Sequence, residues 1–278
     1  MLNKTKTAII SGANGFIGKH LWDALVEKDI QPIALERDTL YAPVPQLIGV
    51  LHHYKPNYII HLASYGNHRG QQDQTKTIMA NYWTTYNLLK ASEFLDYEAF
   101  INVASSSCYG KKRGAMSELD SMYPDTMYAA TKVGGLQLAR AFAKQYKKPV
   151  MTVVPFSVYG EGEASFRFIP TVIKHLVTNE TMQLNAGNTH DWIYVSDFIA
   201  GLLLAIDNID ILKGELLNIG RGVATSNIDV VSLLEDITSK QLNYKGVDNP
   251  NPFDSPLWYA DNTKLLRIGW KSKTPLKQ

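Results

Sequence analysis

The stretch ISGANGFIGKHL, residues 10–21, decides the fold. Its glycines Gly12, Gly15 and Gly18 recur at every third position between an apolar run and an amphipathic run. In a doubly wound α/β fold, the turn between the first strand and the first helix holds a dinucleotide pyrophosphate, because glycine lets the backbone approach the phosphates and the helix N-terminus faces their charge. The spacing therefore predicts a nucleotide-binding turn. The residues predicted to contact the cofactor here are Gly12, Asn14, Gly15, Phe16, Ile17 and Gly18.

Apolar runs of strand length alternate with longer amphipathic stretches through the rest of the chain. Strands that are apolar on both faces and alternate with helices are typical of a parallel sheet covered by helices, with right-handed crossovers. We therefore predict an α/β fold, a doubly wound parallel (Rossmann) sheet with a smaller C-terminal substrate-binding part. The expected strands are 6–11, 31–36, 58–64, 99–105, 150–156 and 215–220. The expected helices are 16–28, 45–54, 74–94, 127–146, 166–179 and 227–240, and 192–206 is expected as a strand or loop running into a helix.

The regular alternation loosens after about residue 160. We predict a dinucleotide-binding domain at residues 1–165 and a smaller substrate-binding part at residues 166–278, from which the chain returns to the core sheet at about 190–222. Prolines and turn residues gather in 248–256, which is predicted to be a loop.

Composition and charge argue against several kinds of partner. The net charge is only +2, which is too small a bias to favour nucleic acid or an acidic membrane surface. Cys108 is the only cysteine, so no intrachain disulfide can form and a reducing compartment fits. No apolar run approaches a membrane span, the N-terminus lacks a signal-peptide pattern, and the histidines show no metal-ligand spacing. We expect a cytoplasmic protein with no nucleic-acid partner, no membrane partner and no metal.

The end of the second expected strand reads Glu36-Arg37, where a doubly wound fold meets the adenosine ribose. A carboxylate at this place accepts the ribose hydroxyls of NAD, whereas an arginine pairs with the additional phosphate of NADP. Glu36 and Arg37 therefore favour opposite cofactors, and the sequence leaves NAD and NADP both open.

The chemical centre is predicted at the end of the strand 99–105. Ligands of an open parallel sheet lie at the carboxyl ends of its strands, which places Ser105 well. Tyr128 and Lys132 follow near the start of a helix, and their spacing of four puts both side chains on one face. A nearby ammonium and an oxidised nicotinamide favour the phenolate of a tyrosine, which can then exchange a proton with a substrate oxygen while hydride moves to or from the cofactor. Ser105 is expected to hydrogen-bond the same oxygen.

A second pair with the same spacing, Tyr86 and Lys90, lies in the middle of the expected helix 74–94. No serine at the end of a preceding strand accompanies this pair, so we interpret it as a chance match.

These motifs together resemble the extended short-chain dehydrogenase/reductases, the NAD-dependent epimerases and dehydratases that act mostly on nucleotide sugars. The resemblance runs from residue 7 to about residue 270 and rests on GANGFIG, HLAS (61–64), Asn81 ahead of NLLKAS, SSSCYG, YAATK, PFSVYG (155–160), DWIYVSD (191–197) and NIG (218–220). It implies that Ser105, Tyr128 and Lys132 are catalytic and that Asn81 completes a polar relay. It implies homodimerisation through helices 74–94 and 127–146. The further cofactor contacts that it implies are Leu62, Ala63, Ser64, Lys132, Pro155, Ser157 and Val158.

Departures from the family pattern narrow the activity. Dehydratases of the family carry an acid–base pair just after the catalytic hydroxyl residue, and here Ser106 and Ser107 stand there, which argues against dehydration. The short stretch before HLAS resembles the smaller ketoreductases. We predict an NAD(P)-dependent oxidoreductase, a 4-ketoreductase of a 4-keto-6-deoxy nucleotide sugar with Tyr128 as the acid. The alternative is a nucleotide-sugar 4-epimerase with bound NAD, and a third interpretation is a non-catalytic NAD(P)-binding regulator. NADPH is preferred if the enzyme is a reductase.

The substrate contacts also depart from the family pattern. Family members usually have an arginine before DW for the substrate diphosphate, and this chain has His190, for which Arg167 or Arg221 are candidate substitutes. The loop SYGNHRG (64–70) is expected to border the sugar through Tyr65, His68 and Arg69. The predicted substrate contacts are thus Tyr65, Ser106, Ser107, Arg167 and His190, with His68 and Arg69 beside them.

Overall fold

A six-stranded parallel sheet forms the centre of the molecule. The computed structural model describes residues 5–68, 70–248 and 257–276, and no helix in these ranges is long and apolar enough to cross a membrane. The strand order is β10-β5-β4-β3-β1-β2, and all neighbours are parallel. The strands are β1 (Lys6–Ser11), β2 (Ile30–Leu35), β3 (Tyr58–His61), β4 (Ala99–Val103), β5 (Val150–Pro155) and β10 (Leu216–Ile219).

The direction of winding reverses between β1 and β3. After β1 the chain forms its outer neighbour β2, and it then crosses back to place β3 on the other side of β1. The carboxyl ends of β1 and β3 therefore border a crevice of the kind in which doubly wound sheets bind their ligands. This confirms the predicted doubly wound parallel sheet.

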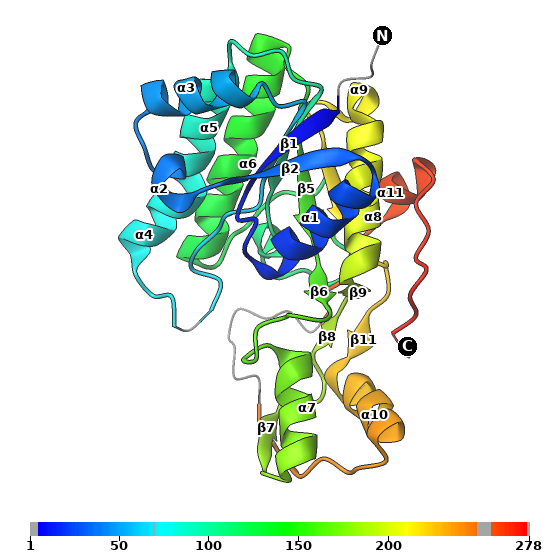
Figure 1. Ribbon diagram of the computed structural model, residues 1–278. Helices are drawn as coiled ribbons and strands as arrows, with labels where there is room; N and C mark the ends of the chain where they lie inside the picture. The colour runs from blue at the N-terminus through cyan, green and yellow to red at the C-terminus, as the bar shows by residue number, and fades with distance from the viewer. Residues whose placement is uncertain (1–4, 69, 249–256, 277–278) are drawn as a thin grey trace.

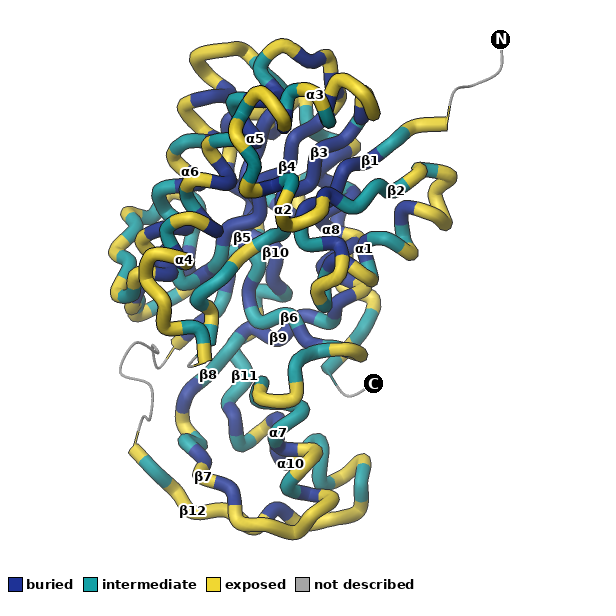
Figure 2. The backbone as a smooth tube through the Cα atoms, turned by 60° about the vertical axis from the view of Figure 1, so that its left-hand side comes forward, coloured by how far each residue is buried: buried dark blue, intermediate teal, exposed yellow. Residues whose placement is uncertain are grey.

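Helices cover both faces of the sheet because its strands alternate their side chains between two apolar cores. Ile10 and Ile60 pack with the helices α1 (Phe16–Glu27) and α8 (Val195–Asp207). Ile9 and Ile59 pack on the opposite face, where the covering helices are α3 (Val44–Tyr54), α5 (Thr84–Ser92) and α6 (Met127–Tyr146). Figure 1 shows the two helical layers on either side of the strands, and Figure 2 shows the central strands β3 and β4 as buried.

The expected helix 74–94 is not one α-helix. It consists of α4 (Gln74–Ile78), a π-helical turn (Met79–Trp83) and α5. π-Helical turns insert an additional residue and are frequent at functional sites. Here the turn contains Asn81, whose side chain is used by another loop, as described below. The helical period of the sequence predicted the element but not this insertion.

The smaller part of the chain lies beyond the carboxyl end of the sheet (Figure 1). Its core is formed by Val172, Leu176, Leu184 and Val231. The strands β6 and β9 pair in parallel and lie where this part meets the sheet. The chain then returns to the sheet through α8 and β10, but the predicted boundary at residue 165 stays a prediction. The elements of this part are β6 (Ser157–Tyr159), α7 (Phe168–Thr178), β7 (Met182–Leu184), β8 (Thr189–His190), β9 (Trp192–Tyr194), β11 (Thr225–Ser226), α10 (Asn227–Thr238) and β12 (Tyr244–Gly246).

Short elements complete the described residues. The sequence patterns did not predict them, because none is long enough to show a period. They are α2 (Arg37–Leu40), a 3₁₀ helix (Ser106–Tyr109), α9 (Ile209–Leu212) and α11 (Thr263–Arg267). The predicted loop 248–256 lies almost wholly outside the described residues, apart from Asp248.

Candidate active site

The glycine turn joins β1 to α1 and leaves its backbone bare. Gly12 has φ +76°, and a Cβ there would lie 2.9 Å from the backbone nitrogen of Ala63. A Cβ on Gly18 would lie 2.2 Å from the carbonyl oxygen of Gly12, so the turn tolerates no side chain at either position. Gly15 caps α1 without a side-chain hydrogen bond. The first N–H groups of α1 are therefore available to an anion, which fits a dinucleotide pyrophosphate. Asn14, Phe16 and Ile17 lie in or next to this turn, exposed or half-buried.

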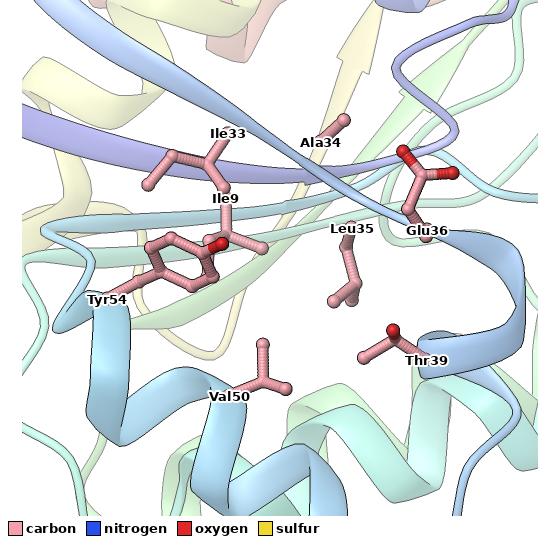
Figure 3. Close-up of a pocket in the computed structure, with 8 residues that line it drawn as sticks. All are labelled: Ile9, Ile33, Ala34, Leu35, Glu36, Thr39, Val50 and Tyr54. Carbon is pink, nitrogen blue, oxygen red and sulfur yellow. The ribbon is translucent and has the colours of Figure 1, made fainter.

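Glu36 and Arg37, which were expected to contact the adenosine ribose, follow β2 but have different surroundings. Glu36 caps α2 and lines a cavity of about 150 Å³ together with Thr39, whereas Tyr54 lies at the other end of this cavity (Figure 3). Arg37 is exposed, and its charge opposes the rise that burial causes in the pKa of Tyr41. The Glu36 carboxylate therefore borders the cavity, while the Arg37 guanidinium acts on Tyr41.

A second cavity, of about 360 Å³, lies on the α1 side of β2. Its lining includes Ala13 and Asn14 of the glycine turn and Lys19 and Trp22 of α1. Neither cavity is lined by Ser105 or Tyr128. Hydrogen bonds and local electrostatics thus define the chemical centre in this structure.

The loop after β3 runs beneath the glycine turn. The backbone N–H groups of Leu62 and Ala63 donate to the carbonyl oxygen of Ser11 (3.1 Å) and to its Oγ (3.3 Å). Ser64 follows, and its hydroxyl interacts with that of Tyr128. The three residues predicted to line the cofactor therefore connect the glycine turn to the predicted catalytic tyrosine.

Ser105 is the last residue before the 3₁₀ helix that follows β4. Its Oγ accepts hydrogen bonds from the Ser107 Oγ (2.9 Å) and from the Ser107 N–H (3.3 Å). Because Ser107 supplies these donors, the hydroxyl proton of Ser105 remains able to donate to a third group. Ser107 therefore orients Ser105, and its predicted contact with substrate stays a prediction.

Tyr128 lies in the first turn of α6, which begins where Thr126 accepts the N–H of Ala129 (3.1 Å). Burial raises the pKa of Tyr128 to about 12, and the hydroxyls of Ser105 and Ser64 and the charge of Arg167 oppose this rise. With the chain's own groups alone, this pKa favours the neutral phenol. The positive charge of an oxidised nicotinamide would favour the phenolate, so the predicted activation of Tyr128 stays a prediction.

Lys132 shares a helix face with Tyr128, but its ammonium group serves a different element. Its Nζ donates to the carbonyl oxygen of Val103 at the end of β4 (2.8 Å). Burial lowers the pKa of Lys132 to about 8. Lys132 is therefore held at the end of β4, and its predicted contact with the cofactor and its predicted catalytic role stay predictions.

Asn81, predicted to complete a polar relay, bonds to Tyr65 and Thr131. Its Oδ1 accepts the N–H of Tyr65 (2.9 Å), and its Nδ2 donates to the Tyr65 carbonyl (2.8 Å) and to Thr131 Oγ1 (3.0 Å). Asn81 is almost fully buried. It therefore positions the loop at Tyr65. It is also connected to the backbone of Tyr128, because Thr131 Oγ1 donates to the Tyr128 carbonyl (2.8 Å). Its predicted part in a polar relay stays a prediction.

Ser106 is buried and accepts a hydrogen bond from the indole Nε1 of Trp258 (2.9 Å), 152 residues away. Trp258 belongs to the segment that also brings the Ala260 N–H to Asp191 (3.1 Å). The sequence analysis missed Trp258, since nothing in its local pattern distinguishes it from a core aromatic residue. Ser106 keeps one proton to donate, and its contact with substrate stays a prediction.

Arg167 and Glu163 extend the site toward α7. Arg167 is the residue before α7. Burial raises the pKa values of Tyr128 and Glu163, and the charge of Arg167 opposes this rise in both. Burial raises the pKa of Glu163 to about 7, and its Oε2 has no hydrogen-bond partner. Glu163 is a candidate site residue that the sequence analysis missed.

His68 packs on Phe166, with ring centroids 4.4 Å apart, so the loop after β3 meets the residues before α7. Arg69 lies outside the described residues.

His190 lies in β8, with its ring 5.4 Å from that of Trp192. The adjacent Asp191 is fully buried and accepts the N–H groups of Arg221 (2.8 Å) and Gly222 (2.9 Å). Arg221, one of the proposed substitutes for the family arginine, is thereby brought next to His190. Of the other predicted cofactor contacts, Pro155 ends β5, and Ser157 and Val158 lie half-buried in β6. Within the described residues, no cluster of three or more acidic, histidine or cysteine side chains is arranged to hold a metal ion.

Comparison with known proteins places this geometry in a family. The NAD dependent epimerase/dehydratase family matches residues 8–220. The Bacillus subtilis (strain 168) protein named uncharacterized UDP-glucose epimerase YtcB is 26% identical, over 94% of this chain and 90% of that protein. A UDP-glucuronic acid 4-epimerase from Bacillus cereus, solved with UDP-glucuronic acid and NAD, is 24% identical with a TM-score of 0.88, and the match covers 98% of this chain and 95% of that one. A UDP-glucose 4-epimerase from Thermotoga maritima, solved with UDP-glucose, is 21% identical with a TM-score of 0.84, and the match covers 98% of this chain and 95% of that one.

The two solved structures confirm the Rossmann-like α/β fold over nearly the whole chain. The family match spans the glycine turn, Ser105, Tyr128, Lys132 and the return to β10. The chain belongs to the NAD dependent epimerase/dehydratase family and is an enzyme of the short-chain dehydrogenase/reductase type.

Proposed function

We propose that this enzyme is a nucleotide-sugar 4-epimerase that retains NAD between turnovers. The names of its relatives support the epimerase over the 4-ketoreductase, which was the first interpretation of the sequence: the Bacillus subtilis relative is named a UDP-glucose epimerase, and both solved structures are 4-epimerases. The choice of the epimerase thus rests on these relatives. The structural observation that supports the proton chemistry is the buried Tyr128 side chain, on whose hydroxyl those of Ser105 and Ser64 act.

The chain's own residues divide the proton chemistry. Tyr128 takes the proton from the 4-hydroxyl of the sugar and later returns it to the same oxygen, so no net proton is consumed. Ser105 donates a hydrogen bond to that oxygen with the proton that its contacts with Ser107 leave available. Bound NAD would supply the hydride acceptor and donor at the sugar carbon, and its positive charge would favour the Tyr128 phenolate. The 4-keto sugar would rotate within the site, so that hydride would return to the opposite face of its carbonyl carbon.

The residues at the end of β2 support NAD as the cofactor. Glu36 borders the cavity at the predicted ribose site, and a carboxylate accepts the two ribose hydroxyls of NAD. Glu36 and Arg37 are both exposed, but Arg37 does not line this cavity and its charge acts on Tyr41, so we propose NAD and not NADP. The NAD bound in the Bacillus cereus structure is consistent with this assignment.

The turn after β4 argues against dehydration. A dehydratase needs a group that abstracts a carbon-bound proton, and Ser106 and Ser107 offer only hydroxyls that are engaged with Trp258 and Ser105. For the substrate we propose a UDP-sugar, because the two solved 4-epimerases hold UDP-sugars. Arg167, Arg221 and His190 are the cationic or ionisable groups proposed to face its diphosphate.

We also propose a homodimer formed through α4–α5 and α6. Trp83 and Tyr86 are 44% and 40% exposed on this helical layer, and Met79 is 39% exposed. Large exposed apolar side chains gathered on one helical face are typical of a contact with another chain.

The test begins with the protein as purified. Denaturation should release stoichiometric NAD or NADH, and the intact protein without added cofactor should convert UDP-glucose or UDP-glucuronic acid to its 4-epimer, detected by NMR. An enzyme that recycles its hydride has no need to release the cofactor. Protein that is free of dinucleotide and oxidises added NADPH with a 4-keto nucleotide sugar would instead establish the ketoreductase and end the epimerase proposal.

A further inference from the structure

A buried row of polar residues crosses the sheet near its carboxyl edge. Ser11 and His61 are paired in register on the neighbouring strands β1 and β3, and each is at most 1% exposed. Their side chains meet, with Ser11 Oγ 2.6 Å from His61 Nδ1. Buried polar groups are costly unless they are hydrogen-bonded, so a polar pair inside an otherwise apolar sheet needs an explanation.

The hydrogen bonds continue from His61 into the π-helical turn. His61 Nε2 lies 3.1 Å from Thr85 Oγ1, and Thr85 Oγ1 donates to the carbonyl oxygen of Asn81 (2.8 Å). A Cβ on Gly135 of α6 would come within 3.0 Å of this carbonyl and 3.2 Å of the Thr85 hydroxyl. Gly135 of α6 therefore packs directly against the point of the π-helical turn and α5 that the hydrogen bonds reach.

The direction of each hydrogen bond in this chain can be assigned. Thr85 gives its proton to Asn81, so the contact with His61 requires that Nε2 carry the hydrogen. Burial and the charge of Lys132 lower the pKa of His61 to about 3, so the ring is neutral and Nδ1 is an acceptor. Ser11 must therefore donate to Nδ1, which leaves Ser11 Oγ to accept the N–H of Ala63.

Both ends of this hydrogen-bond chain hold the same loop, the one that follows β3. At one end, Ser11 holds Ala63 beneath Gly12. At the other end, the Asn81 side chain holds both backbone groups of Tyr65. Ser64 lies between these two anchors, and its hydroxyl faces Tyr128. Residues 63–65 are thus fixed from both sides by groups that meet at His61.

We propose that His61 is a positioning residue, and that the hydrogen-bond chain Ala63–Ser11–His61–Thr85–Asn81–Tyr65 sets the loop 63–65 against the bound dinucleotide and against Tyr128. The proposal rests on the proposed function only for the identity of the ligands. A matched feature is available as a control. Asn102 and Thr152 continue the same register on β4 and β5, with Asn102 Nδ2 donating to Thr152 Oγ1 (3.2 Å). Both are as buried as His61 to within a few per cent, but their hydrogen bond does not connect to the loop 63–65.

The test removes one hydroxyl from each system. Thr85→Val breaks the chain in its middle with little change of volume, Thr85→Ser keeps the hydroxyl, and Thr152→Val removes a comparable buried hydrogen bond elsewhere in the sheet. The dissociation constant for NADH is measured by calorimetry after bound dinucleotide has been removed. The KM and kcat for UDP-glucose or UDP-glucuronic acid are measured on the holoenzyme, and urea unfolding reports the stability of each variant.

We expect Thr85→Val to weaken NADH binding about fivefold, the factor that corresponds to one hydrogen bond of about 1 kcal/mol, and to raise KM more than it lowers kcat. Thr85→Ser should bind NADH like the unmodified protein, and Thr152→Val should lose stability without losing affinity. Equal affinity in Thr85→Val and Thr152→Val would overturn the proposal and leave His61 as a packing residue.

The other end of the chain gives a second test if Thr85→Val does not fold. Ser11→Ala removes the donor to His61 and the acceptor of Ala63, whereas Ser11→Thr retains both. The same difference in NADH affinity between these two variants supports the proposal, and its absence refutes it. NADH binding needs no turnover, so a protein that lacks epimerase activity but shows the affinity differences would refute the proposed function alone.

Discussion

Replacement of Tyr128 by phenylalanine tests the chemical centre most directly. The substitution removes one oxygen from a side chain that is 9% exposed, so solvent has little access to replace the missing proton donor and acceptor. The backbone of α6 and its cap at Thr126 do not involve this oxygen. The fold and the glycine turn should therefore be retained while the proton transfer is lost.

The magnitude follows from the role of the hydroxyl. Positioned general acid–base catalysis contributes about 10²–10⁴-fold, so kcat should fall by that factor, or about 3–5 kcal/mol in the activation barrier. Ser105 keeps its contacts with Ser107 in this variant. Tyr128 is a neutral phenol, so its replacement by Phe leaves no buried charge without a partner. The free energy of unfolding should change by about 1 kcal/mol or less.

The assay follows formation of the 4-epimer by NMR, with the dinucleotide content measured on the same sample. Tyr86→Phe is the matched control, because Tyr86 has the same spacing to a lysine but is 40% exposed, and Lys90 pairs with Glu93. Retention of near-full activity by Tyr128→Phe would refute the mechanism. Equal losses in both variants would show that the effect does not come from proton transfer at Tyr128.

Four further predictions concern charge and assembly. Positive nicotinamide favours the phenolate of Tyr128, whose pKa is about 12 without cofactor, so the affinity for NAD, measured by calorimetry, should rise with pH and lose this dependence in Tyr128→Phe. Burial holds the pKa of His61 at about 3, so its contribution to stability is complete above about pH 6.5 and falls by up to about 1.4 kcal/mol per pH unit below it. The Tm of His61→Gln should accordingly fall less on acidification. Glu163 has the opposite sign: its raised pKa of about 7 makes the folded state less stable as pH rises through that value, so Glu163→Gln should raise the Tm more in alkaline than in acidic buffer. Trp83→Glu should convert the proposed dimer to monomers in light scattering, whereas Val177→Glu, on the exposed face of α7, should not.

The sequence predicted those parts of the site that depend on local pattern. The three glycines, the strand that ends near Ser105 and the Tyr128–Lys132 pair are each recognisable within about a dozen residues. Their placement at the carboxyl edge follows from the parallel sheet, because every strand of such a sheet ends on the same side. The central strands were predicted to within a few residues, since their apolar runs are bounded by turn residues on both sides.

Activity was less well predicted than chemistry. Tyr128, Ser105 and Lys132 serve a ketoreductase and a 4-epimerase alike, so these residues could not decide between the two, and the first interpretation favoured the reductase. The choice depends on whether the dinucleotide is released, which reflects contacts all around the cofactor and not a single motif.

The sequence by itself determined the fold class, and it predicted the glycine turn and the tyrosine proposed to transfer the proton, because each has a periodic or motif signal along the chain. Only the tertiary structure placed Ser64 beside Tyr128, tied Trp258 to Ser106 across 152 residues, and joined Ser11 to Thr85 through His61. The physical reason is that periodicity indicates which face of an element is buried, whereas the partner on that face depends on strand order and helix packing. Strand order here places β3 beside β1, helix packing brings Thr85 and the π-helical turn to His61, and neither feature has a signal in the local sequence.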